Sequence, residues 1–374
     1  MKIGIVCYPT FGGSGVLATE LGKALALRGH QVHFITYSQP VRLDIFNPNI
    51  FYHEVPVPSY PLFEYPPYEL ALSSSMVEVI MRHHLDLLHV HYAIPHASAG
   101  YMAKKILQSK TGRDIPMITT LHGTDITLVG KDKTYEPAVT FSINESDGIT
   151  AVSENLREET YKNFNISKQI EVIYNFVDVE RFHNHHNNNC KCLFAPNDEK
   201  IIMHASNFRR VKRVRDVIKI FSNISKQINA KLLMVGDGPE RIHCEELARS
   251  LGVDRDVRFL GKQEKVEEIF PCADLFILPS EYESFGLAAL EAMASHTPVL
   301  STNVGGIPEV NIDGNTGYLY NTGDTDTASQ KAIELLSDEQ KLSTMKENAY
   351  RHALEFDIEK IIPHYENFYR RFLK

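Results

Sequence analysis

Residues 275–301, LFILPSEYESFGLAALEAMASHTPVLS, contain the unit from which the fold can be predicted. The four apolar residues 275–278 are typical of a buried strand, and a helical pattern begins at about Phe285. A further apolar run at 299–301 completes a strand–helix–strand unit. Because such a crossover joins parallel strands, the stretch predicts a parallel sheet with helices packed on its faces.

The same alternation extends outward from this unit through both halves of the chain. Strand-like apolar runs separated by helical patterns recur at residues 2–8, 31–36, 86–90, 117–121, 148–152, 170–173, 200–204, 231–235 and 257–260. This order predicts an α/β fold with two Rossmann-like, doubly wound parallel sheets. Ligands of such sheets bind beyond the carboxyl ends of the strands, so we expect the active site in a cleft that both domains face.

One stretch breaks the alternation and separates the two predicted domains. Residues 183–192, HNHHNNNCKC, are polar and of low complexity, which is typical of a loop or linker. We therefore predict an N-terminal domain over residues 1–180, a polar linker region over 181–199 and a C-terminal domain over 200–355. A last helical pattern lies within residues 356–374.

The composition narrows the class of protein and its partners. The 374 residues carry a net charge of −8, with 43% hydrophobic and 23% charged residues, which is typical of a globular protein and not of a disordered one. The acidic balance disfavours a large nucleic-acid surface, and no run of about 18 apolar residues predicts a membrane span. The chain begins with a strand-like run rather than a secretory leader, and its five cysteines are widely spaced. We therefore expect a reduced, cytoplasmic protein without nucleic-acid or membrane partners.

A glycine-rich loop follows the first strand. Gly13, Gly15 and Ala18 match the dinucleotide-binding pattern G-x-G-x-x-G/A, in which backbone N–H groups approach an anion at a helix start. The acidic residue that usually binds the ribose is absent, because the second strand ends in TYS at residues 36–38. A nicotinamide or flavin site is therefore disfavoured. A tight structural turn and a contact with an anion or a sugar both stay open.

Two glutamates flank the start of the helix in the unit quoted above. A helix that begins near Ser284 places Glu283 at its mouth and Glu291 about two turns further on, on nearly the same face. Free N–H groups at a helix start accept a phosphate, and a carboxylate beside it suits ribose or sugar hydroxyls. The alternative is a capped helix with one glycine kink and no ligand. The residues whose N–H groups would face a phosphate are Phe285, Gly286 and Leu287.

A basic run lies at a strand–helix junction of the second predicted domain. Residues 206–213, SNFRRVKR, place four cations in an otherwise acidic protein. Cations at a helix start oppose the helix dipole, so this placement costs stability unless an anion is bound nearby. The pattern favours a diphosphate held by Arg209 and Lys212, and a solvated surface loop is the alternative.

His122 emerges at the end of a buried strand and is followed by a glycine, where the cleft is expected. Such a histidine either binds a ligand or has a structural role, and the sequence leaves both open. Three further histidines, His89, His91 and His96, have no acidic residue nearby to complete a metal shell. We therefore predict no metal at these positions, and we interpret the His/Cys-rich run 183–192 as linker.

These patterns together resemble a known family. Over nearly its whole length the chain is similar to the family 4 retaining glycosyltransferases of GT-B fold. The most specific element is the pair Glu283-x7-Glu291 within ESFGLAALEAMA, accompanied by Lys212, the glycine loop at 12–15 and the run GGIPE at 305–309. The family fold implies that the C-terminal helix returns toward the N-terminal domain.

The resemblance implies roles for the residues around the donor. Glu291 would hold a UDP ribose, while Glu283 and His122 would hold sugar hydroxyls. Lys212, Arg209 and the helix N-terminus would neutralise the leaving diphosphate, so neither a divalent metal nor another cofactor is implied. Many members carry arginine five residues before the lysine; this chain has Asn207 there, and Arg209 can supply that charge. The implied catalytic residues are His122, Glu283, Arg209 and Lys212. The implied donor-binding residues are Gly13, Asn207, Arg209, Lys212, Glu283, Ser284, Phe285, Gly286, Leu287 and Glu291.

Several runs, among them HFITYSQPVRL, HVHYAIPHA and TTLHGTDIT, narrow the resemblance to one branch of the family. That branch transfers N-acetylglucosamine from UDP-N-acetylglucosamine to L-malate, the first step of bacillithiol biosynthesis. The resemblance therefore implies these two small-molecule substrates and retention by front-face attack. The expected acceptor residues are Gly13, Ser14, Gly15, Tyr92, Thr119, Thr120 and Asn175, with Arg42 as a weaker candidate.

Three alternatives stay open at the level of the sequence. A family 4 glycosyltransferase with another small-molecule or lipid acceptor would share every motif above. A UDP-N-acetylglucosamine 2-epimerase would share the fold class and the donor, although the two-glutamate motif favours a transferase. The third alternative is a protein that binds a sugar nucleotide without acting on it. The sequence also leaves open whether the chain forms a homo-oligomer.

Overall fold

The computed structural model describes residues 1–10, 12–43, 46–57, 64–130, 132–183, 191 and 193–373. The chain divides into two compact units: unit 1 comprises Met1–Asn175 and Lys360–Lys374, and unit 2 comprises Phe176–Glu359. Most of the His/Cys-rich run interpreted as linker, with His185, His186, Cys190 and Cys192, lies outside the described residues.

Unit 1 is built on a seven-stranded, all-parallel sheet in the order β3-β2-β1-β4-β5-β6-β7. The sequence pattern predicts all of these strands except β3, an edge strand that is mostly half-buried and lacks a continuous apolar run. The central strands are buried along their length, as expected for a parallel sheet covered by helices on both faces. The strands are β1 (Lys2–Val6), β2 (Gln31–Thr36), β3 (Ile50–Glu54), β4 (Leu87–His91), β5 (Met117–Leu121), β6 (Gly148–Ala151) and β7 (Ile170–Val172).

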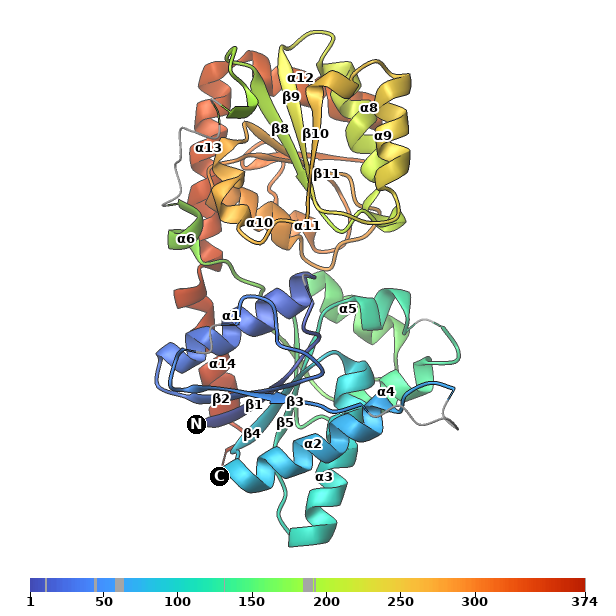
Figure 1. Cartoon of the computed structure of the whole chain (residues 1–374), viewed down its shortest axis with the longest axis vertical. Helices are drawn as coiled ribbons and strands as arrows, with labels where there is room; N and C mark the ends of the chain where they lie inside the picture. Colours follow the sequence, from blue (N-terminus) through green and yellow to red (C-terminus); the bar gives the residue numbers. More distant parts are fainter. Residues whose placement is uncertain are drawn as a thin grey trace. The chain divides into compact units, whose positions relative to one another are not determined.

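The helices of unit 1 include the last helix of the chain. They are α1 (Gly13–Leu27), α2 (Tyr68–His83), α3 (Ser98–Thr111), α4 (Glu136–Glu145), α5 (Glu154–Asn163) and α14 (Ile358–Arg370). Figure 1 shows α14, in red, beside the blue N-terminal elements of this unit. The Tyr369 hydroxyl is hydrogen-bonded to His89 Nδ1 at 2.8 Å, and His30 Nε2 donates to Glu366 at 2.8 Å. These contacts hold the C-terminal helix in the N-terminal unit, as the family resemblance implies.

Unit 2 is built on a six-stranded, all-parallel sheet in the order β10-β9-β8-β11-β12-β13. The stretch 275–301 forms β11, α10 and β12, so the predicted strand–helix–strand unit is confirmed. The sequence pattern misses only β13, which has four residues, two of them half-buried. The strands are β8 (Lys200–Ala205), β9 (Ala230–Val235), β10 (Val257–Gly261), β11 (Leu275–Leu278), β12 (Val299–Thr302) and β13 (Gly317–Tyr320).

Seven helices of unit 2 lie in the described part of the chain, and two of them begin later than the sequence predicts. They are α6 (Val179–His183), α8 (Val214–Ile224), α9 (Arg241–Ser250), α10 (Leu287–Ala294), α11 (Ile307–Val310), α12 (Thr325–Ser337) and α13 (Glu339–Ala353). Helix α8 starts after Lys212 because Arg213 adopts φ 47°, and α10 starts after Ser284 because Gly286 adopts φ 98°. The two sheets confirm the predicted α/β class with two Rossmann-like domains.

The structure bears on two expectations, the lack of a membrane span and the reduced state of the cysteines. No helix in the described ranges is both long and apolar enough to cross a membrane. Cys7 and Cys244 are buried free thiols, whereas Cys272 is disulfide-bonded. The expectation of a fully reduced chain is therefore wrong at Cys272.

Candidate active site

The candidate residues form one cluster in each unit, and each cluster follows the carboxyl ends of adjacent strands. In unit 1, the cluster comprises Ser14 after β1, Tyr92 after β4, and His122 with Asp125 after β5. In unit 2, the cluster comprises Lys212 after β8, and Ser280 with Glu283 after β11. These are the positions at which open α/β sheets bind ligands.

The glycine loop of unit 1 packs tightly against the segment that follows β1. A side chain at Gly15 would place its Cβ 2.4 Å from the Tyr8 carbonyl oxygen, so only glycine fits there. The Tyr92 hydroxyl donates to Ser14 Oγ at 2.6 Å. This bond links the loop after β1 to the loop after β4. The loop therefore presents a fixed hydroxyl pair next to the first backbone N–H groups of α1.

His122 is held by a second buried histidine. Its Nε2 is hydrogen-bonded to Nδ1 of His91 at 2.8 Å, and the two rings are stacked with centroids 5.1 Å apart. Burial, together with nearby His96, lowers the pKa of His122 to about 3. The ring is therefore neutral near pH 7, so it can exchange hydrogen bonds with a hydroxyl but does not serve as a cationic acid.

Asp125 is a residue of this cluster to which the sequence assigned no role. Its carboxylate accepts from the backbone N–H of Ala93 at 2.8 Å and of Gly123 at 3.2 Å, and the side chain is buried. It thereby ties the loop that carries Tyr92 to the loop that carries His122. The sequence offers one signal for this role, since Asp125 stands three residues after His122 at the end of a buried strand. The hydrogen bond to Ala93, however, joins elements that are distant in the sequence and could not be predicted.

Burial raises the pKa of the Asp125 carboxyl to about 6, although the hydrogen bonds from backbone N–H groups favour the carboxylate and lower this pKa. A carboxyl with a raised folded-state pKa stabilises the fold fully below its unfolded pKa, near 4. That contribution is lost as the pH rises through about 6. We therefore expect wild type to lose about 2 kcal/mol of unfolding free energy relative to Asp125→Asn between pH 4 and pH 7. Urea denaturation of both proteins at several pH values measures this, and a pH-independent difference would contradict it.

In unit 2, Lys212 and Glu283 form a half-buried ion pair. Lys212 Nζ donates to Glu283 Oε1 at 2.5 Å, and the same oxygen accepts from Ser280 Oγ at 2.8 Å. Glycine is required at 305, where φ is 56° and an added Cβ would lie 1.9 Å from the Glu283 carbonyl oxygen. The backbone N–H of Gly306 donates to that carbonyl at 2.9 Å. A cation and a carboxylate are thus fixed side by side at one loop.

The remaining residues predicted for unit 2 show two differences from expectation. Because α10 begins at Leu287, its free N–H groups start there rather than at Phe285. Glu291 consequently lies about one turn into the helix rather than two, and it is half-buried. Arg209 and Asn207 are exposed, and no described carboxylate pairs with Arg209, so its charge stays available to a ligand.

Three residues of unit 1 that were predicted to bind the acceptor are buried. Thr119 and Thr120 are fully buried within β5, and their hydroxyls are hydrogen-bonded to Ser146 and to Thr150. Since these hydroxyls are already used inside the sheet, the expectation that they bind a ligand is not supported by their positions. Asn175, also buried, lies at the end of unit 1 and stays a prediction.

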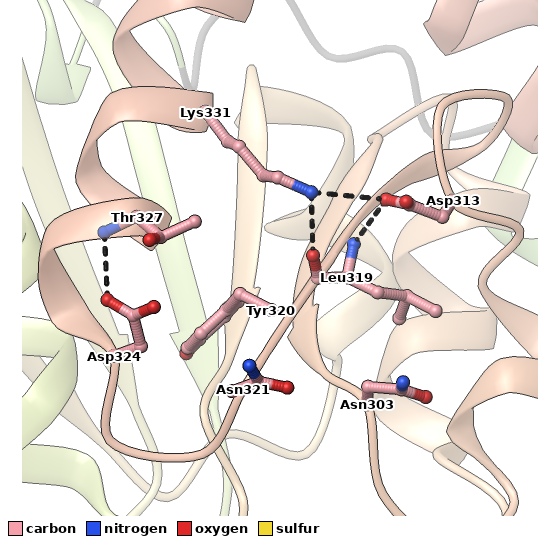
Figure 2. A pocket seen from close by; sticks show the side chains of 8 residues that line it. All are labelled: Asn303, Asp313, Leu319, Tyr320, Asn321, Asp324, Thr327 and Lys331. Atoms are coloured by element: carbon pink, nitrogen blue, oxygen red, sulfur yellow. Dashed lines mark hydrogen bonds and ion pairs between the residues drawn. The ribbon is translucent and has the colours of Figure 1, made fainter.

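A pocket of about 440 Å³ lies at the carboxyl ends of β12 and β13 in unit 2. Figure 2 shows Lys331 directed toward Asp313 and the Leu319 carbonyl oxygen, with contacts of 3.5 and 2.8 Å. Asp324 accepts from the Thr327 N–H at 3.1 Å and thereby caps α12. The charged groups Lys331, Asp313 and Asp324 of this pocket therefore have partners within the protein.

Comparison with known proteins agrees with the geometry of both units. Residues 11–181 match the model of Glycosyltransferase Family 4, and residues 188–352 match that of Glycosyl transferases group 1. The chain is 49% identical to the N-acetyl-alpha-D-glucosaminyl L-malate synthase of Bacillus anthracis, over 99% of this chain and 96% of that protein. It is 30% identical to an uncharacterized glycosyltransferase of Methanocaldococcus jannaschii, over 83% and 82% of the respective chains.

Solved structures with low sequence identity share the fold. The sucrose-phosphate synthase of Thermosynechococcus elongatus superimposes with a TM-score of 0.81 at 22% identity, over 99% of this chain and 98% of that one. Anabaena HepE in complex with UDP-glucose superimposes with a TM-score of 0.82 at 19% identity, over 99% and 100% of the two chains.

Proposed function

The chain belongs to the family 4 glycosyltransferases of GT-B fold, and from this membership we propose that it transfers N-acetylglucosamine from UDP-N-acetylglucosamine to the hydroxyl of L-malate. The observation that carries the proposal is the 49% identity to the malate synthase over nearly the full length of both proteins. This reaction would be the first step of bacillithiol biosynthesis, and the configuration of the sugar would be retained.

The unit 2 cluster supports the donor side of this proposal. Breaking the glycosidic bond transfers negative charge to the diphosphate, and fixed cations stabilise such charge as it develops. Lys212 is held in place by Glu283, and exposed Arg209 stands three residues before it in the sequence. The first N–H groups of α10 add a partial positive charge. Glu283 would accept hydrogen bonds from sugar hydroxyls, and Glu291 from those of the ribose.

The unit 1 cluster supports the acceptor side. Malate is a small dianion, and backbone N–H groups at the start of α1 with the Ser14 and Tyr92 hydroxyls can bind a carboxylate. Neutral His122 would hydrogen-bond a hydroxyl of the transferred sugar. In front-face attack the leaving phosphate oxygen accepts the proton of the malate hydroxyl, so no protein carboxylate is needed as a nucleophile, unlike in double-displacement glycosidases.

The activity can be tested by measuring UDP release from UDP-N-acetylglucosamine with and without L-malate. Release that depends on malate is the expected result. Release without an acceptor would indicate a hydrolase or an epimerase, and binding without release would indicate a non-catalytic sugar-nucleotide protein. Release with a lipid or sugar acceptor, but not with malate, would support glycosyltransferase activity and contradict malate as the acceptor.

Glu291→Ala is expected to weaken UDP binding by about 1.5–3 kcal/mol, or roughly 10- to 150-fold, because a ribose hydroxyl loses a charged acceptor. Titration calorimetry with UDP measures the change. Glu246→Ala, at an exposed glutamate of α9 in the same unit, is the matched control and should bind UDP as wild type does. Equal affinities of Glu291→Ala and wild type would show that Glu291 does not bind the ribose.

We also expect full activity in excess EDTA. Lys212, Arg209 and the start of α10 are proposed to supply the charge stabilisation for which other transferases use Mg²⁺. The rate of malate-dependent UDP release, before and after exhaustive dialysis against the chelator, measures this. A loss of rate that Mg²⁺ restores would contradict metal-independent transfer.

A further inference from the structure

Three histidines outside the candidate active site converge in unit 1. His33 belongs to β2, His53 to the edge strand β3, and His83 is the last residue of α2. One ring nitrogen from each residue lies within 4.8 Å of those of the other two. Among the described residues this is the one group of three or more metal-competent side chains with such spacing.

The pairing of the two strands explains why the rings meet. In the parallel register of β2 and β3, His33 pairs with Phe51 and Ile35 pairs with His53. Since side chains alternate between the faces of a strand, His33 and His53 point to the same face, one diagonal step apart. The ring of His83 lies over this face, with its centroid 4.6 Å from that of His33 and 5.0 Å from that of His53.

The hydrogen bonds of the cluster leave ligand capacity unused. His33 Nδ1 is 3.0 Å from His53 Nε2, while Nε2 of His33 has no hydrogen-bond partner in the described part of the chain, although the residue is only 1% exposed. Buried polar atoms without a partner are rare. An imidazole binds metals in its neutral form, which is the main form of histidine near pH 7.

We propose that His33, His53 and His83 bind a first-row transition-metal dication of the Zn²⁺ class. Three imidazoles suit zinc and its neighbours, whereas Mg²⁺ and Ca²⁺ select oxygen ligands. His53 and His83 are half-buried, so an ion can enter from solvent, and water can complete its coordination. Phe51 stacks on His33 with centroids 4.6 Å apart and fixes the orientation of the buried ring.

The charges around the cluster are balanced rather than anionic. Lys2 Nζ donates to the His83 carbonyl oxygen at 3.2 Å, which anchors the end of α2 beside the start of β1. Arg82 is paired with Glu78 at 2.7 Å on the exposed side of α2. The affinity must therefore come from the imidazoles themselves, which is a reason for expecting selectivity for zinc-class ions over hard cations.

The role of such an ion is structural. Lys2 marks the amino end of the sheet, whereas Tyr92 and His122 follow the carboxyl ends of β4 and β5. An ion bound by the three histidines would fasten the edge strand β3 to α2 and stabilise unit 1, because binding to the folded state alone raises stability. It takes no part in sugar transfer, so its removal by EDTA should lower the thermal midpoint and leave the rate at moderate temperature unchanged.

The test uses the metal-free full-length protein titrated with Co²⁺, whose visible absorption reports coordination by imidazoles, followed by competition with Zn²⁺. One equivalent should give a visible band that Zn²⁺ abolishes. His53→Ala and His83→Ala, both at half-buried positions that can be truncated without unfolding, should each weaken binding at least roughly 100-fold. Zn²⁺ should raise the thermal midpoint of wild type but not of these variants.

Two matched controls locate the site. His84→Asn removes the next imidazole along the chain, which is exposed and has φ 55°, a conformation that asparagine tolerates. The double variant His183→Ala/His296→Ala removes the hydrogen-bonded histidine pair of unit 2. Both should bind Co²⁺ as wild type does. The proposal is overturned if wild type gives no visible band, if His53→Ala and His83→Ala bind as wild type does, or if the unit 2 variant abolishes the band.

Discussion

Replacing Lys212 with alanine is expected to lower kcat/KM for transfer by roughly 10²–10³-fold, mostly through kcat. The lysine is held beside Glu283 before substrate arrives, so its charge needs little reorganisation as the diphosphate leaves. The substitution also leaves the half-buried carboxylate of Glu283 without its cation, which opposes the approach of an anionic donor. Steady-state rates of malate-dependent UDP release measure both parameters.

Lys226→Ala, at an exposed lysine bonded to Asn223 elsewhere in unit 2, is the control for the loss of one positive charge and should retain wild-type rates. Circular dichroism establishes that both variants are folded. A Lys212→Ala enzyme within about threefold of the wild-type kcat would mean that this lysine does not stabilise the leaving group.

Lactate is expected to be a much poorer acceptor than malate, by about 30- to 1000-fold in kcat/KM. It lacks one carboxylate, so the donors that face this group in malate are left desolvated and unpaired, at a cost of about 2–4 kcal/mol. Tyr92→Phe should lower kcat/KM for malate more than it changes UDP affinity, because Tyr92 belongs to the cluster of unit 1 and Lys212 and Glu283 to that of unit 2. Competing acceptor assays and UDP titrations separate the two effects.

Comparable rates with lactate and malate would contradict a dianion site, even if the glycosyltransferase assignment stands. A Tyr92→Phe effect confined to UDP affinity would place the tyrosine at the donor instead. Neither outcome bears on the proposed roles of Lys212 and Glu283, so the Lys212→Ala prediction and the acceptor prediction can fail independently.

Most of the fold can be predicted from local patterns in the sequence. Parallel strands covered on both faces are continuous apolar runs, and such runs with helical patterns between them mark 11 of the 13 strands of the two sheets. The strands that escape prediction, β3 and β13, lie at sheet edges, where burial on one side leaves no continuous apolar run. What defines these strands is hydrogen bonding to a neighbour that is distant in the sequence.

The candidate site is predictable where a motif is local and less so where tertiary contacts decide. The pair Glu283 and Lys212 was expected from two separate motifs, and the structure brings the two side chains into contact. Helix α10 begins later than expected because Gly286 adopts a positive φ. Glycine permits this conformation but does not require it, so the sequence alone does not predict it. The sequence predicts that Thr119 and Thr120 bind the acceptor, but in the structure their hydroxyls are hydrogen-bonded to the hydroxyls of Ser146, after α4, and Thr150, on β6.

Asp125 and the three-histidine cluster show a further limit of sequence reasoning. Asp125 bonds to Ala93 across 32 residues, and His33, His53 and His83 are spread over three elements. No spacing rule links them, because β2 and β3 must first pair in register and α2 must pack on their face. Such groups become visible only when the sheet order is known.

The anomeric configuration and identity of the product test the central proposal most directly. UDP-N-acetylglucosamine, an α-linked donor, is incubated with L-malate and enzyme, and the product is examined by mass spectrometry and by proton NMR of the anomeric position. We expect an O-linked conjugate of N-acetylglucosamine and malate with the α configuration retained. A β-linked conjugate would contradict front-face transfer, and UDP release without any malate conjugate would contradict the proposed function itself.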